Sequence, residues 1–213
     1  VPEESEPPAR RIVRNAALDR AVRERARDGE AAAALAQISR ARLDGAYAAL
    51  LRAEVAQALF AQGRDREAFE IAAEAARAGT GVALPGLIAG LAAWALNQPE
   101  VAFAYFDNAA RAEIAAPATR AAAAFWTARA AVRSRRPQSY VPWMMQAAQE
   151  PRTFYGLVAR RVLGLPMGFA WEREIAGEGE GAAIAETAAG WRALALLQIG
   201  QRERAEAELR AMW

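Results

Sequence analysis

Three stretches of the sequence share one register: GEAAAALAQISRA at residues 29–41, GRDREAFEIAAEA at residues 63–75 and NQPEVAFAYFDNA at residues 97–109. Each begins 34 positions after the one before it. An alanine follows each first residue by five positions and another by twelve: Ala34, Ala68 and Ala102, then Ala41, Ala75 and Ala109. A 34-residue period with small residues at fixed places is typical of repeated pairs of antiparallel helices. The three stretches therefore predict an all-α fold.

The first residue of each stretch suits the end of a helix. Gly29, Gly63 and Asn97 tolerate the left-handed backbone conformation that stops a helix, and Arg135 takes the same place 38 residues after Asn97. Small alanines let neighbouring helices approach closely. We expect a right-handed α-solenoid of helix pairs of the tetratricopeptide-repeat (TPR) type over residues 10–213. A disordered, acidic and proline-rich leader is expected at residues 1–9, and an insert loop at about 165–183.

Apolar periodicity and turn residues divide the repeat region into expected helices. They span residues 10–28, 30–41, 44–62, 65–78, 84–96, 100–112, 117–133, 138–150, 153–163, 186–199 and 201–213. Many arginines lie in the first helix, and Asp19, Glu24 and Asp28 are expected to pair with them locally on a solvated face. A nucleic-acid-binding arm is the alternative.

Composition excludes several classes of chemistry. The sequence has no histidine and no cysteine, so it lacks imidazole bases, Cys–His nucleophiles, common zinc sites and disulfides. We expect no metal and no cofactor. All 27 basic residues are arginine, but the formal charge is only +2, which argues against nucleic acid as a partner. The sequence contains no run of 18 apolar residues, so we expect no transmembrane segment.

Aromatic residues and one glycine-rich loop have structural interpretations. Phe69 and Phe103 occupy matching repeat positions, and most other aromatic residues have the spacing of a helical core, although a stacking surface for a sugar or base is possible. The loop GEGEG at residues 177–181 lacks the strand and lysine of a phosphate-binding loop. We interpret it as a surface turn.

Three segments resemble the periplasmic soluble lytic murein transglycosylases. They are AAAFWTARAAVR at residues 122–133, PRTFYGLVARRVLG at residues 151–164 and GWRALALLQIGQRERAEAELRAMW at residues 190–213. The resemblance is best over residues 116–213. It implies a superhelical scaffold for an enzyme of the periplasm that acts on the cell wall. In that family a separate C-terminal domain cleaves peptidoglycan with one glutamic acid and leaves a 1,6-anhydro-muramoyl end.

The catalytic motifs of that family are not found in this sequence. The family has a Glu-Ser pair and a Gly-Leu-Met-Gln motif, whereas the one Glu-Ser here is Glu4-Ser5 in the expected leader. No catalytic residue is assigned, and the chain alone is expected to be inactive. Its expected partners are peptidoglycan glycan strands and a C-terminal catalytic domain outside these residues. The alternative function is a TPR-like interaction module that binds a partner peptide in its concave groove.

Four arginines are the candidate contacts of such a groove. Arg129 and Arg133 are four residues apart on one helix face, and Arg160 and Arg161 lie on the next expected helix but one. Their guanidinium groups suit muramyl carboxylates or an acidic surface of the catalytic domain. The alternative is that they are solvated or paired with neighbouring acids.

Overall fold

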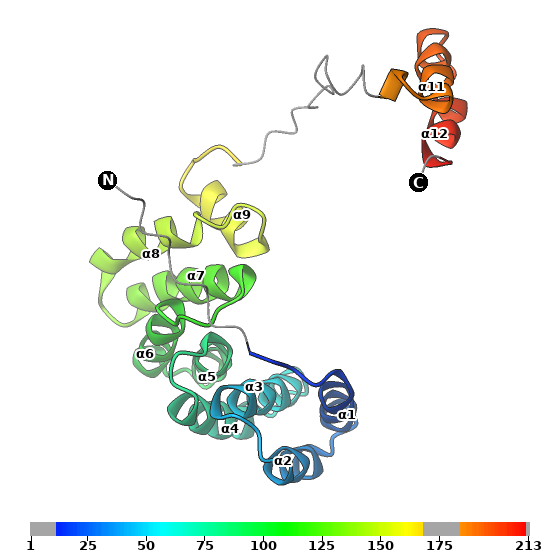
Figure 1. The fold of residues 1–213 in the computed structure, drawn as a ribbon. Helices are drawn as coiled ribbons and strands as arrows, with labels where there is room; N and C mark the ends of the chain where they lie inside the picture. Colours follow the sequence, from blue (N-terminus) through cyan, green and yellow to red (C-terminus); the bar gives the residue numbers. More distant parts are fainter. Residues whose placement is uncertain (1–11, 168–183, 212–213) are drawn as a thin grey trace, which may run out of the picture. The chain divides into compact units, whose positions relative to one another are not determined.

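The computed structural model describes residues 12–167 and 184–211, which separate into two compact units within residues 1–168 and 169–213 (Figure 1). The expected leader and the GEGEG loop lie outside the described residues, as does most of the expected insert. The described residues form eleven α-helices and a single 3-10 helix. Unit 1 contains α1 (Ala16–Arg27), α2 (Ala31–Arg40), α3 (Gly45–Ala61), α4 (Asp65–Ala78), α5 (Ala83–Ala95), α6 (Pro99–Ala110), α7 (Pro117–Arg133), η1 (Pro137–Ser139), α8 (Tyr140–Ala147) and α9 (Phe154–Val162), and unit 2 contains α11 (Ala188–Gln198) and α12 (Arg202–Arg210).

The all-α prediction is confirmed for the described residues. The one β-type contact among them is an isolated bridge between Val82 and Ile114. In unit 1, each helix packs on the next along the chain, and the odd-numbered helices from α1 to α9 also pack on one another in order. The even-numbered helices pack on odd-numbered neighbours, so unit 1 has two layers of helices (Figure 1).

The residues predicted to end helices have the predicted left-handed conformation. The φ angles are 84° at Gly29, 76° at Gly63, 58° at Asn97 and 59° at Arg135. At each turn the following N–H bonds to the carbonyl five residues earlier, as from Glu30 to Arg25 at 2.9 Å. The other such bonds are Arg64 to Leu59, Gln98 to Ala93 and Arg136 to Ala131. This pattern is a Schellman motif, which satisfies carbonyl groups at the helix end.

The alanines of the repeat are buried with one exception. Ala34, Ala68 and Ala102 have no exposed surface. Ala75 and Ala109 are buried too. Ala41 is exposed instead, because α2 ends at Arg40 and leaves this residue in the cap.

The start of α1 differs from the expected helix at residues 10–28. Asn15 caps the helix: its side chain accepts hydrogen bonds from the N–H groups of Ala17 and Leu18, so residues 12–14 stay outside it. Glu54 on α3 pairs with Arg14 at 2.7 Å and with Arg23 at 2.8 Å. Part of the arginine charge is thus balanced by a distant helix, and not only by the local acids that we expected.

The expected helix at residues 138–150 is divided. The chain forms the 3-10 turn η1 first, and α8 then covers only Tyr140–Ala147. Residues 149–153 form turns that lead into α9, whose N-cap is Thr153. Pro137 and Pro151 flank the expected helix at residues 138–150. The missing N–H and the fixed φ of proline favour an interruption of the helix at these two positions.

A local motif recurs in the two units at a spacing of 34 residues. Thr153 caps α9 and Thr187 caps α11, and each side chain accepts a hydrogen bond from a glycine N–H three residues later. A Cβ atom at either glycine, Gly156 or Gly190, would overlap a backbone carbonyl oxygen at 1.9 Å. Both positions therefore require glycine.

Unit 2 has little buried surface of its own. Gly190, Ala193 and Ala205 are its buried residues among those described. Apolar side chains lie on both of its helices, at Leu194 and Leu197 on α11 and at Leu209 on α12. Leu197 is 45% exposed, while Leu194 and Leu209 are half-buried.

Replacing Ala68 with leucine should lower the free energy of unfolding by about 1–3 kcal/mol, because the added methyl groups have no space at this fully buried site. Ala104→Leu on α6 is a matched control, since Ala104 is exposed. Chemical denaturation followed by circular dichroism measures both. Equal stability of the two variants would contradict the close packing inferred at Ala68.

Candidate functional site

Two of the four candidate arginines line one groove. The groove has a volume of about 510 Å³ and lies between α5, α7, α8 and α9; we call it the arginine groove. Its lining residues are Trp94, Phe125, Arg129, Val132, Arg133, Tyr140, Met144 and Val162. The four-residue spacing on α7 places Arg129 and Arg133 on the same side of that helix, as the sequence predicted.

Aromatic rings hold both guanidinium groups. The guanidinium carbon of Arg133 lies 4.6 Å from the ring centroid of Trp94, and that of Arg129 lies 5.2 Å from the centroid of Trp126. Arg133 also donates a hydrogen bond of 2.6 Å to the side-chain oxygen of Asn97 in the turn after α5. These contacts restrict the two side chains and so lower the entropy lost on binding a ligand.

The rings themselves belong to the core of unit 1. The Trp94 and Trp126 centroids are 5.5 Å apart in an edge-to-face arrangement, and Trp126 stacks on Phe106 at 6.0 Å. Phe125 and Tyr155 continue the cluster at 5.0 Å. The structure thus places these aromatic residues in core packing. Trp94 has a second role as a support for the groove arginines.

The charge of the groove is not balanced within the described residues. Arg129 and Arg133 form no ion pair there, and neither do Arg135 and Arg136 in the following turn. Arg136 lies over the ring of Phe103 at 4.6 Å. Four exposed cations within eight residues therefore form no ion pair with any carboxylate of residues 12–167 or 184–211, which favours binding of an anion.

The other two candidates do not line this groove. Arg160 donates hydrogen bonds to the backbone carbonyl groups of Ala148, at 3.0 Å, and of Pro166. It thereby ties the end of α8 to the segment after α9. Arg161 is exposed, and its side chain forms no hydrogen bond or ion pair among the described residues. Arg160 is thus engaged by the fold, and Arg161 is on the open surface.

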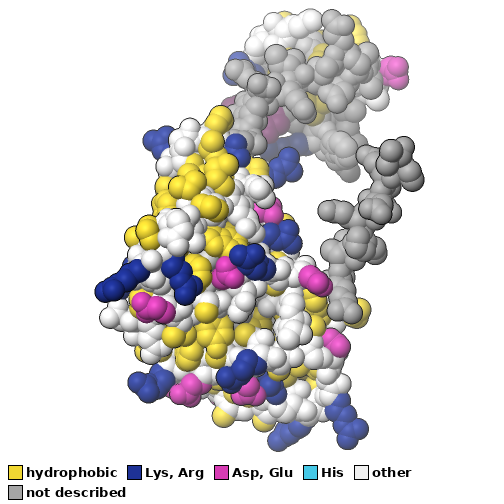
Figure 2. All heavy atoms as spheres, turned by 90° about the vertical axis from the view of Figure 1, so that its left-hand side faces the viewer, with side chains coloured by type: hydrophobic (Ala, Val, Ile, Leu, Met, Phe, Trp, Pro, Cys, Tyr) yellow, Lys and Arg dark blue, Asp and Glu magenta, His cyan; other side chains and the backbone are white. Residues whose placement is uncertain are grey.

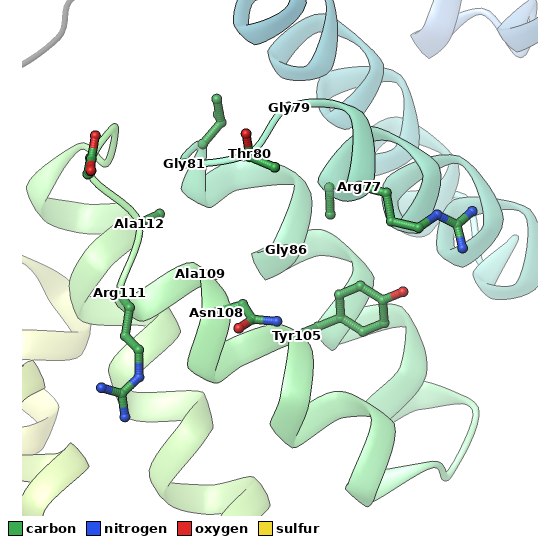
Figure 3. Close-up of a pocket in the computed structure, with 13 residues that line it drawn as sticks. Arg77, Gly79, Thr80, Gly81, Gly86, Tyr105, Asn108, Ala109, Arg111 and Ala112 are labelled. Atoms are coloured by element: carbon green, nitrogen blue, oxygen red, sulfur yellow. The ribbon is translucent and has the colours of Figure 1, made fainter.

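A second hollow lies between α4, α5 and α6, and sequence reasoning missed it (Figure 3). Its volume is about 550 Å³. Arg77 and Arg111 lie on opposite sides of it, and Tyr105 and Asn108 lie between them (Figure 3). Arg111 pairs with Asp107 at 3.1 Å, a hydrogen bond that raises the pKa of Arg111, so only part of this positive charge is open to a ligand. Gly79 and Gly81, in the turn between α4 and α5, were the sequence feature that could have indicated this hollow.

Comparison with protein-family models, with curated proteins and with solved structures finds no match to this chain. Within residues 12–167 and 184–211, no helix has both the length and the apolar character needed to cross a membrane. The same residues bring no three acidic side chains together as a metal site.

Proposed function

We propose that this chain is a superhelical scaffold region of a lytic transglycosylase that acts on peptidoglycan in the periplasm. It would position the glycan strand and a catalytic domain outside these 213 residues. The segments that resemble that family fall on α7, on α9 and on the α11–α12 pair. Two observations support a right-handed, TPR-like solenoid: unit 1 has two layers of helices, and a residue with positive φ ends a helix at each repeated turn.

The arginine groove carries this proposal. Peptidoglycan presents carboxylates, and guanidinium groups bind a carboxylate through two parallel hydrogen bonds. Arg129 and Arg133 are held in place by indole rings and form no ion pair with a carboxylate in the part of the chain that the structure describes. An anionic cell-wall polymer supplies the missing charge.

The described carboxyl groups support a role in binding more than one in catalysis. A transglycosylase needs a carboxyl group that stays protonated near neutral pH, which requires a raised pKa. Asp19 is the one buried acid among the described residues. Burial alone would raise its pKa, but hydrogen bonds from Arg14 and Tyr47 and the nearby arginine charges lower it overall. Asp19 is therefore a structural anion.

A second candidate function is a TPR-like module that binds a partner peptide. It is favoured by another groove, of about 540 Å³, on the layer of odd-numbered helices. Arg23, Glu54, Gln57, Gln62 and Leu84 are among its lining residues. This mixture of polar and apolar side chains is suited to an extended backbone. A peptide bound there, with no binding of cell wall, would favour this function.

The purified chain should bind peptidoglycan sacculi without cleaving them. We expect co-sedimentation that weakens as salt rises from about 0.05 M to about 0.5 M, because salt screens the arginine charges. Chromatography of the supernatant should show no anhydro-muropeptides above a control without protein. Release of such products would overturn the scaffold assignment, and a failure to sediment with sacculi at low salt would contradict peptidoglycan binding.

A further inference from the structure

We infer that the arginine groove recognises a carboxylate with an aliphatic group beside it, as in the stem peptides of peptidoglycan, and that it does not recognise the sugar rings. This inference rests on the proposed function and specifies which part of the polymer is bound. Three properties of the groove carry it: its hydrogen-bonding groups, its covered aromatic ring and its exposed valines.

The hydrogen-bonding groups of the groove are mostly donors. An arginine side chain has five N–H donors and no acceptor. Arg129 and Arg133 supply these donors, and the other polar side-chain groups of the lining are the hydroxyl of Tyr140 and the indole N–H of Trp94, which is also a donor. The side-chain oxygen of nearby Asn97 already accepts a bond from Arg133. Sugar hydroxyls need acceptors as well as donors, whereas a carboxylate only accepts, so the groove suits the carboxylate.

The Trp94 ring is not available for stacking on a sugar. The Arg133 guanidinium lies over this ring at 4.6 Å, and Arg129 lies at 6.0 Å from the same centroid. A sugar ring would have to displace a cation from an indole to occupy that position. The arrangement instead leaves guanidinium N–H groups, other than the one by which Arg133 bonds to Asn97, directed away from the ring face and able to donate to a ligand.

The remaining wall of the groove is apolar. Val132 on α7 and Val162 on α9 are each 52% exposed, and Phe125 and Met144 are buried beneath. Hydrophobic side chains and arginines also adjoin one another on the face shown in Figure 2. A ligand with an aliphatic group would cover the exposed valines, at about 25 cal/mol for each Å² removed from water. The pyranose rings themselves offer no such group.

The test compares three ligands with the complete chain. They are intact sacculi, soluble stem peptide released from sacculi by an amidase, and chitin oligosaccharides, whose N-acetylglucosamine rings carry neither a lactyl carboxylate nor a peptide. We expect sacculi and stem peptide to bind, measured by co-sedimentation and by isothermal titration calorimetry, and the chitin oligosaccharides to bind at least about tenfold more weakly. Binding of chitin oligosaccharides as strong as that of sacculi, with no binding of stem peptide, would overturn the inference and leave the proposed function in place. No binding of sacculi would instead remove the proposed function.

A matched pair of variants tests the apolar wall. Val162→Ser should weaken stem-peptide binding by about threefold to tenfold, because it removes aliphatic surface from the groove. Val141→Ser is the control, since Val141 is 55% exposed on α8 but does not line the groove. Equal affinities of the two variants would contradict a role for the aliphatic group.

Discussion

Replacing Phe106 with alanine is expected to lower the free energy of unfolding by about 3–5 kcal/mol. Phe106 lies on α6 and has no exposed surface. Its ring stacks on Trp126 of α7 at 6.0 Å, and it also faces Gly90 of α5. Truncation would therefore remove contacts that join three consecutive helices.

The cavity left by this truncation has little room to collapse. A Cβ atom at Gly90 would lie only 2.4 Å from the Phe106 ring, so the ring packs directly against the backbone of α5. Backbone atoms of a helix cannot move into the vacated space as a side chain can. The loss of unfolding free energy should thus lie toward the upper end of the range for truncation of buried aromatic residues.

Phe154→Ala is a matched control for this prediction. Phe154 is 72% exposed, and its truncation should change stability by at most about 0.5 kcal/mol. Urea denaturation followed by tryptophan fluorescence and circular dichroism compares the two variants. Similar losses of stability in both would contradict the packing at Phe106.

Local rules predicted most of the fold. The turns at Gly29, Gly63 and Asn97 follow from residues that tolerate positive φ at a fixed period. Arg135 was also placed correctly, although it follows Asn97 by 38 residues and so departs from that period. Sequence reasoning failed where distant segments meet. The Arg14–Glu54 pair joins residues 40 positions apart, and no local pattern distinguishes it from an exposed arginine.

The candidate site was predictable only in part, for the same reason. The shared face of Arg129 and Arg133 follows from helix geometry, so it was predicted. Of their supports, Trp94 lies on α5 and Asn97 lies in the α5–α6 turn, so predicting them required knowledge of how α5 packs on α7. Arg160 donates to the carbonyl group of Ala148 at the end of α8 because α8 is shorter than the sequence suggested.

The double variant Arg129→Gln/Arg133→Gln should have the largest effect on binding. Each hydrogen bond between charged groups contributes about 1.5–3 kcal/mol, so loss of one such bond at each position weakens binding by about a hundredfold or more. Glutamine keeps a polar group near Asn97 and Trp94, which limits the effect on folding. Both arginines are exposed, and a thermal denaturation midpoint close to that of the unchanged chain would confirm that the fold is retained.

The double variant Arg40→Gln/Arg66→Gln provides the control, because both residues are exposed and lie outside the groove. It removes two positive charges from the chain, as the groove variant does. The single measurement is the dissociation constant for sacculi, obtained by co-sedimentation at low salt for the unchanged chain and for both double variants. An arginine groove that binds peptidoglycan predicts about hundredfold weaker binding for the groove variant and nearly unchanged binding for the control. Equal dissociation constants for the two double variants would contradict the proposed site.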